Sequence, residues 1–118
     1  MDATSNATAA TVRAFNEAFN SHDIDAVMAL MTDDCIFENT SPSPDGTRHV
    51  GAGNVRIAFG EFFAGSSQAR FDEEEFIACQ DRCIVRWRYT WGDGHIRGVD
   101  VMRVRNGKVS EKLAYVKG

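Results

Sequence analysis

The stretch Val99-Asp100-Val101-Met102-Arg103-Val104-Arg105-Asn106-Gly107-Lys108-Val109 decides how this chain folds. It predicts a β-strand, a two-residue turn and the start of a second strand, because Asn-Gly between alternating apolar residues is the strongest short hairpin signal. One carboxylate, Asp100, stands in the middle of the apolar strand. An acid at a strand centre is costly unless it faces water, a partner or a ligand pocket. Asp100 is therefore the first candidate for a functional residue.

Helical periodicity dominates the first half of the chain. Apolar residues recur at helical spacing from about Ser5 to Phe19, and Asp23 is placed to cap a short second helix that runs through Met31. Residues 35–38 predict a strand, and residues 40–50 hold both prolines and predict a loop. A third helix is expected after Gly51, with its phenylalanines on one side.

The second half of the chain predicts four strands, at residues 69–79, 83–91, 95–105 and 109–117. Their connections are Asp81-Arg82, Gly92-Asp93-Gly94 and Asn106-Gly107. Connections this short cannot make a parallel crossover, so neighbouring strands should be antiparallel. Helices followed by a strand meander indicate one α+β domain over residues 1–118.

Composition narrows the classes of function. The chain has 118 residues, 43% of them hydrophobic, and a net charge of −4. Nucleic acids and anionic membrane surfaces attract clustered positive charge, so neither is an expected partner. We expect no signal peptide and no membrane-spanning segment, because no apolar run is long enough. Three cysteines are an odd number, which favours a reduced, cytoplasmic protein and leaves open whether Cys79 and Cys83 pair. The three histidines show no ligand spacing, so no metal site is expected.

Strand alternation sorts the side chains of the meander into two faces. The arginines of strands 83–91 and 95–105 fall on one face, which we interpret as the outer surface. The other face would lie under the helices, and we expect it to carry Trp87, Tyr89, Asp100, Met102, Leu113 and Tyr115. An apolar concavity with few polar groups is the usual construction of a small-molecule site. Two alternatives stay open: Asp100 facing solvent, and aromatic residues that form a plain core.

At this point the chain resembles the nuclear transport factor 2-like superfamily, and within it the SnoaL-like branch of polyketide cyclases and ketosteroid isomerases. The resemblance rests on Phe19-Asn20-Ser21-His22-Asp23, residues 25–30, Asp33-Asp34-Cys35, the glycine-led helix at Gly51, residues 98–104, residues 106–109 and Glu111. It implies a cone-shaped, cystatin-like fold, in which three N-terminal helices close over a strongly curved, mainly antiparallel sheet and leave an internal pocket. It also implies a homodimer through the outer sheet face and no cofactor.

The resemblance also carries expectations for the site. Ketosteroid isomerases use a tyrosine, an aspartate base and an aspartic acid donor, and the matching positions here are Phe15, Asn39 and Asp100. Phe15 cannot donate a hydrogen bond and Asn39 is no useful base, so steroid isomerisation by that mechanism is not expected. SnoaL-type cyclases rely on a pocket aspartate, for which Asp100 is the counterpart. Epoxide hydrolase relatives pair two aspartates with an arginine; Arg88 or Arg97 could partner Asp100, with Glu38 the only stand-in for the second acid.

The sequence thus leads to a hypothesis and its rivals. The hypothesis is a pocket for a small, mostly apolar, carbonyl-bearing ligand, in a cofactor-independent isomerase, cyclase or hydrolase that uses Asp100. The ligand-binding residues would be Phe15, Phe37, Asn39, Phe59, Trp87, Tyr89, Met102 and Tyr115. The rivals are a non-catalytic ligand-binding or dimerisation domain and a protein-interaction module.

Overall fold

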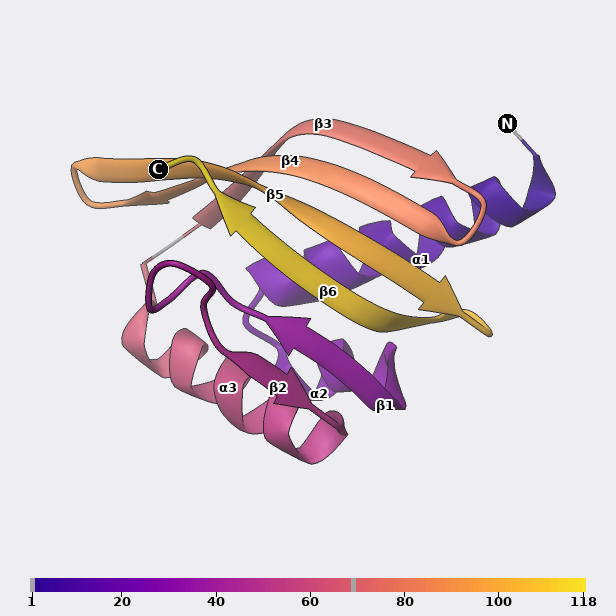
Figure 1. Ribbon diagram of the computed structural model, residues 1–118, viewed down its shortest axis with the longest axis horizontal. Helices are drawn as coiled ribbons and strands as arrows, with labels where there is room; N and C mark the ends of the chain where they lie inside the picture. Colours follow the sequence, from indigo (N-terminus) through magenta and orange to yellow (C-terminus); the bar gives the residue numbers. More distant parts are fainter. Residues whose placement is uncertain (1, 69) are drawn as a thin grey trace.

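Three helices pack on one face of a six-stranded sheet in this computed structural model, which describes residues 2–68 and 70–118 (Figure 1). The helices are α1 (Ala3–Asn20), α2 (Ile24–Ala29) and α3 (Ala52–Gly65). The strands are β1 (Met31–Glu38), β2 (Arg48–Val50), β3 (Arg70–Cys79), β4 (Arg82–Trp91), β5 (Gly94–Arg105) and β6 (Lys108–Val116). The expected α+β class is confirmed.

The strand order is β2-β1-β6-β5-β4-β3. Every neighbouring pair is antiparallel except β1 and β6, which run parallel. Figure 1 shows α1 behind the long strands β4 to β6, and α3 beside β1 and β2. This arrangement covers one face of the sheet, the inner face, and leaves the other, the outer face, open.

Local sequence signals explain where the helices begin. The Asp2 carboxylate accepts a hydrogen bond from the Ser5 backbone N–H at 2.7 Å and so caps α1. Asp23 caps α2 in the same way through the Ala26 N–H, as the sequence predicts. The core forms where these helices meet the sheet, and its fully buried members include Val12, Phe15, Val27, Val55, Phe59 and Met102.

The observed turns agree with the predicted strand meander, except that one connection lies one residue earlier than expected. Asn106 and Gly107 both have positive φ, which is the backbone that a two-residue hairpin turn requires. The turn expected at Asp81-Arg82 lies one residue earlier, at Gln80-Asp81, because Gln80 adopts the left-handed conformation. The first hairpin therefore pairs Cys79 with Arg82.

The second helix is shorter than its apolar pattern predicts. It ends at Ala29, and Met31 already belongs to β1, where it pairs with Val109 of β6. The Val109 N–H donates to the Leu30 carbonyl at 2.7 Å, so pairing with a strand distant in the sequence replaces the last helical turn. The predicted loop over residues 40–50 likewise ends in a short strand, β2, which pairs with β1.

A bulge in the last hairpin changes which side chains of β6 face inward. Arg103 pairs with Glu111, but the next residue, Val104, pairs with Val109, so Ser110 is one extra residue. Alternation shifts by one position from there on. The expectation that Leu113 and Tyr115 face inward is therefore wrong, and Lys112 and Ala114 take the inner positions.

The described residues contain no helix long and apolar enough to cross a membrane.

Candidate functional site

A buried ion pair lies on the inner face of the sheet. The Lys112 ammonium Nζ donates a hydrogen bond to Asp100 Oδ2 at 2.7 Å, and each of the two side chains is only 8% exposed. Asp100 lies near the centre of β5, and Lys112 lies on the neighbouring strand opposite Met102. Burying two charges is costly even when they pair, so a gain in stability does not by itself account for this pair.

Aromatic rings surround the ammonium group. Lys112 Nζ lies 5.2 Å from the centroid of the Phe19 ring and 5.8 Å from that of Phe37. Both distances are within the range of cation–π attraction. Phe19 is the last aromatic residue of α1 and Phe37 lies on β1, so the Lys112 ammonium contacts both the helix layer and the strand next to its own.

An apolar cavity of about 270 Å³ opens beside the ion pair. Its aromatic and aliphatic wall consists of Phe19, Phe37, Ala58, Phe59, Phe62, Phe71, Trp87, Tyr89, Ile96 and Ala114. Its polar residues are Asp100 and Lys112 together with Asn39, Thr40 and Ser41 from the loop after β1. Small-molecule sites have this composition: a mainly apolar wall with a few placed polar groups.

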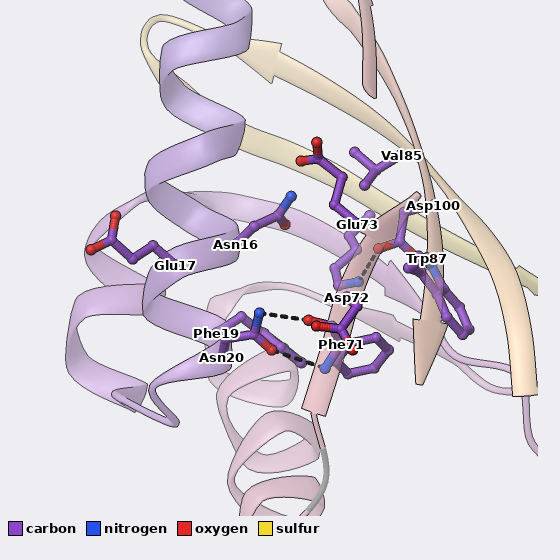
Figure 2. A pocket seen from close by; sticks show the side chains of 11 residues that line it. Asn16, Glu17, Phe19, Asn20, Phe71, Asp72, Glu73, Val85, Trp87 and Asp100 are labelled. Carbon is purple, nitrogen blue, oxygen red and sulfur yellow. Dashed lines mark hydrogen bonds and ion pairs between the residues drawn. The ribbon is translucent and has the colours of Figure 1, made fainter. Parts of the chain in front are cut away.

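A smaller cavity of about 140 Å³ reaches the same ion pair from the side of α1 and β3 (Figure 2). Its wall is more polar, with Asn16, Glu17, Asn20, Asp72 and Glu73. Five residues line both cavities: Phe19, Phe71, Trp87, Asp100 and Lys112. The ion pair thus belongs to a wall that the two cavities share.

Paired hydrogen bonds fix one part of that shared wall. The Asn20 side-chain amide donates to the Phe71 carbonyl at 2.9 Å, and the Phe71 N–H donates to Asn20 Oδ1 at 3.1 Å. These bonds join the end of α1 to β3, as Figure 2 shows. The Phe71 ring in turn packs edge to face on Trp87 with centroids 5.1 Å apart.

The structure brings together six of the nine residues that the sequence singled out. Asp100, Phe37, Asn39, Phe59, Trp87 and Tyr89 all line the apolar cavity. Phe15 and Met102 are fully buried in the core and do not belong to its lining. Tyr115 is 55% exposed on the outer face, because the bulge at Ser110 turns it away from the cavity.

The expected arginine partners of Asp100 are elsewhere. Arg97 lies on the outer face, where its Nε donates to Glu74 at 2.9 Å, and Arg88 lies on the same face of its strand as Arg86. Glu38 pairs with Arg48 at the end of β1 and not with Asp100. Sequence reasoning missed Lys112, because strict alternation from Val109 assigns it to the outer face.

Asn39 organises the loop at the cavity mouth. Its Oδ1 accepts hydrogen bonds from the Thr47 N–H at 2.8 Å and the Ser41 N–H at 3.3 Å. The Asn39 side chain therefore sets the shape of residues 39–47. In the described part of the chain, no group of three or more His, Cys, Asp or Glu side chains is arranged to hold a metal ion.

Comparisons with known proteins identify the family. Residues 12–112 match the family model of the SnoaL-like domain. An NTF2-like protein of unknown function from Mesorhizobium loti is 41% identical, with 100% of this chain and 97% of that chain covered and a TM-score of 0.89. No curated protein sequence matches this chain.

More distant solved structures share the fold. A proposed ketosteroid isomerase from Kribbella flavida is 19% identical, with 96% of this chain and 79% of that chain covered and a TM-score of 0.84. A proposed polyketide cyclase from Sinorhizobium meliloti is 16% identical, with 90% and 94% covered and a TM-score of 0.78. The family match and the relative from Mesorhizobium loti show that the chain belongs to the SnoaL-like domain family of NTF2-like proteins.

Proposed function

We propose that this protein binds a small, mostly apolar molecule with a carbonyl group and acts on it as a cofactor-independent acid–base enzyme. The observation that carries the proposal is the buried Asp100–Lys112 pair in the wall of an aromatic cavity. A paired carboxylate and ammonium at 2.7 Å supply a proton acceptor and a proton donor at one place. Two solved structures of the same fold are described as a proposed ketosteroid isomerase and a proposed polyketide cyclase, which supports the same class of chemistry.

Each charged group has a role in the proposed reaction. Lys112 donates a hydrogen bond to the carbonyl oxygen of the ligand, and Asp100 takes a proton from the carbon next to that carbonyl. The electron pair of the broken C–H bond moves onto the oxygen, where the ammonium stabilises the enolate. In a ligand with a neighbouring C=C bond, return of the proton from Asp100 to the far carbon of the dienolate completes an isomerisation. Where the enolate carbon instead attacks a second carbonyl, the ring closes and Asp100 returns its proton to the new alkoxide oxygen. General acid–base catalysis of this kind contributes about 10²–10⁴-fold.

The test is hydrogen exchange at carbon, which needs no knowledge of the natural substrate. A two-ring ketone such as 1-tetralone is incubated with the protein in D₂O, and deuterium next to the carbonyl is measured by mass spectrometry. We expect exchange above the buffer rate, and a loss of about 10²-fold or more in Asp100→Asn and in Lys112→Met. Glu75→Gln, which changes an outer-face carboxylate, is the matched control and should leave the rate unchanged. Equal exchange by wild type and Asp100→Asn would overturn the catalytic role.

A second candidate function is ligand binding or dimerisation without catalysis. A ketone that binds but gains no deuterium would favour ligand binding alone. Dimerisation is supported by an apolar row that crosses the outer face at matched register and consists of Ile77, Ile84, Val101 and Leu113. Ile77 is 49% exposed in this row, and the neighbouring Tyr115 is 55% exposed. Arginine–carboxylate pairs flank the row, as a polar rim flanks an interface.

The dimer proposal is tested by sedimentation at micromolar concentration. We expect a dimer, and we expect Ile77→Lys to convert it to a monomer because a charge replaces the exposed edge of the apolar row. Wild type that sediments only as a monomer would overturn this proposal. Location in the cytoplasm is also part of the proposal, since a reducing compartment keeps the three free cysteines as thiols.

A further inference from the structure

Two buried polar atoms in the shared wall have no hydrogen-bond partner among the described residues. They are Asp100 Oδ1, the carboxylate oxygen that Lys112 does not contact, and the indole nitrogen Nε1 of Trp87. Trp87 as a whole is 5% exposed and Asp100 is 6% exposed. Buried polar atoms in folded proteins nearly always have a hydrogen-bond partner. Two buried atoms without one in the same wall therefore indicate that a partner is missing.

The Trp87 side chain is held in place by its neighbours. It lies opposite Gly98 on β5, and a Cβ atom at Gly98 would come within 2.5 Å of the indole ring. Phe71 packs against the ring from β3. Only a residue without a side chain lets the indole lie this close to β5, two residues from Asp100 along that strand. Figure 2 shows Trp87 and Asp100 next to each other in the wall.

The chemistry of the two atoms defines what would satisfy them. An indole N–H can only donate a hydrogen bond, and a carboxylate oxygen can only accept one. Water can do both, and so can a ligand that carries a donor beside an acceptor. A carboxylate ligand offers acceptors alone and places a like charge beside Asp100, while a hydrocarbon satisfies neither atom.

We propose that the head group of the ligand is a carbonyl with a hydroxyl on the neighbouring carbon, or the corresponding enol. The carbonyl oxygen accepts from Trp87 Nε1–H and from Lys112, and the hydroxyl donates to Asp100 Oδ1. Both atoms are shielded from solvent in this structure, so the head group reaches them by displacing side chains of the shared wall. This inference rests on the proposed function and narrows its substrate class.

The cavity volume limits the size of the molecule that carries this head group. An engineered apolar cavity of about 150 Å³ accommodates benzene. The apolar cavity here measures about 270 Å³, which fits a two-ring compound. The ligand class is thus a two-ring hydroxyketone with no net charge.

The experiment compares four two-ring probes: tetralin, 1-tetralone, 2-hydroxy-1-tetralone and tetralin-1-carboxylate. Binding is followed in ¹⁵N-labelled protein by the two indole N–H resonances, which Trp91→Phe assigns. We expect the hydroxyketone to bind about tenfold or more tightly than tetralin, with the simple ketone between them and the carboxylate weakest. The Trp87 indole proton should move downfield with the hydroxyketone and not with tetralin, because only the former gives it an acceptor.

Trp87→Phe tests the donor directly, since it keeps an aromatic ring and removes the N–H. We expect Trp87→Phe to weaken binding of the hydroxyketone about tenfold and to leave binding of tetralin unchanged. Trp91→Phe should change the affinity for neither compound. If Trp87→Phe does not fold, the downfield shift of the Trp87 indole proton in the wild type still shows whether the hydroxyketone accepts its hydrogen bond.

Equal binding of tetralin and the hydroxyketone, with an unmoved Trp87 resonance, would overturn the head-group inference and leave the apolar pocket standing. Failure of all four probes to bind would overturn the proposed function as well. A resonance that is already downfield without ligand would show that an ordered water satisfies the indole, which also overturns the inference.

Discussion

Two ion pairs of the same length lie on opposite faces of the sheet. On the inner face Lys112 Nζ and Asp100 Oδ2 are 2.7 Å apart, and each side chain is 8% exposed. On the outer face Arg86 Nε and Glu75 Oε1 are also 2.7 Å apart, but their side chains are 47% and 49% exposed. Distance does not distinguish them, whereas contact with water does.

The difference in exposure shows which of the two ion pairs can be explained by stability alone. Exposed pairs contribute about 0–1 kcal/mol each, and the outer face has several, so losing one changes little. A buried pair is hard to form and is often no more stable than apolar residues of the same size. Because apolar residues of the same size could fill the place of the inner pair without a loss of stability, its position beside an apolar cavity favours a role in binding or chemistry.

The largest effect is expected from breaking the inner pair on one side. Lys112→Met leaves the Asp100 carboxylate buried without a partner and should lower the free energy of unfolding by about 3–5 kcal/mol. Urea unfolding at neutral pH measures this change. The double variant Asp100→Leu/Lys112→Met should recover most of the loss, because no buried charge remains. A loss below about 1 kcal/mol in Lys112→Met would show that the inner pair behaves like an outer one.

A smaller effect is expected from a buried thiol on the same inner face. Burial raises the pKa of the Cys83 thiol to about 12 from its ordinary value of 9.0. Above pH 9 the unfolded chain loses this proton while the folded chain keeps it, so stability should fall as pH rises from about 9 to 12. Urea midpoints measured across this range should fall more steeply for wild type than for Cys83→Ala. Cys79→Ser, which changes an exposed thiol, should keep the wild-type slope.

Local patterns predicted the parts of this fold that local interactions decide. The caps at Asp23 and the Asn106-Gly107 turn are where the sequence places them, because each depends on residues a few positions away. The early end of α2 at Ala29 depends instead on Val109, which binds the Leu30 carbonyl from a distant strand. A pattern within residues 23–31 holds no information about that contact.

In the candidate site, too, the sequence predicted what local alternation decides and missed what a single irregularity in a strand decides. Alternation on β4 and β5 predicted that Trp87, Tyr89 and Asp100 share a face, and the cavity lining confirms that placement. On β6 the single extra residue, Ser110, reverses the alternation, so the sequence reasoning assigned Tyr115 to the cavity and Lys112 to the outer surface. One bulge thus concealed the partner of Asp100, and with it the feature that distinguishes the two faces.

The substitution Gly98→Ala should change the packing of the inner face without changing its charge. In Gly98→Ala the added Cβ would lie 2.3 Å from the Tyr115 carbonyl oxygen and 2.5 Å from the Trp87 ring. Overpacking of this kind should destabilise the protein by about 1–3 kcal/mol, measured by urea unfolding. Trp87 fluorescence in a Trp91→Phe background should also change, because the indole must move. An unchanged spectrum together with unchanged stability would contradict the close packing of Trp87 on β5.

The smallest effect on stability is expected from breaking an ion pair on the outer face. Arg86→Met removes one partner of an ion pair as short as the inner one, yet water can solvate the Glu75 carboxylate that remains. Stability should therefore change by less than about 1 kcal/mol, and the change should shrink further at high salt, because screening weakens exposed pairs more than buried ones. Arg86→Met and Lys112→Met both convert a paired cation to methionine, so urea unfolding of the two variants side by side isolates burial as the cause. If Arg86→Met costs as much as Lys112→Met, burial does not distinguish the two pairs and the argument for a functional inner pair loses its basis.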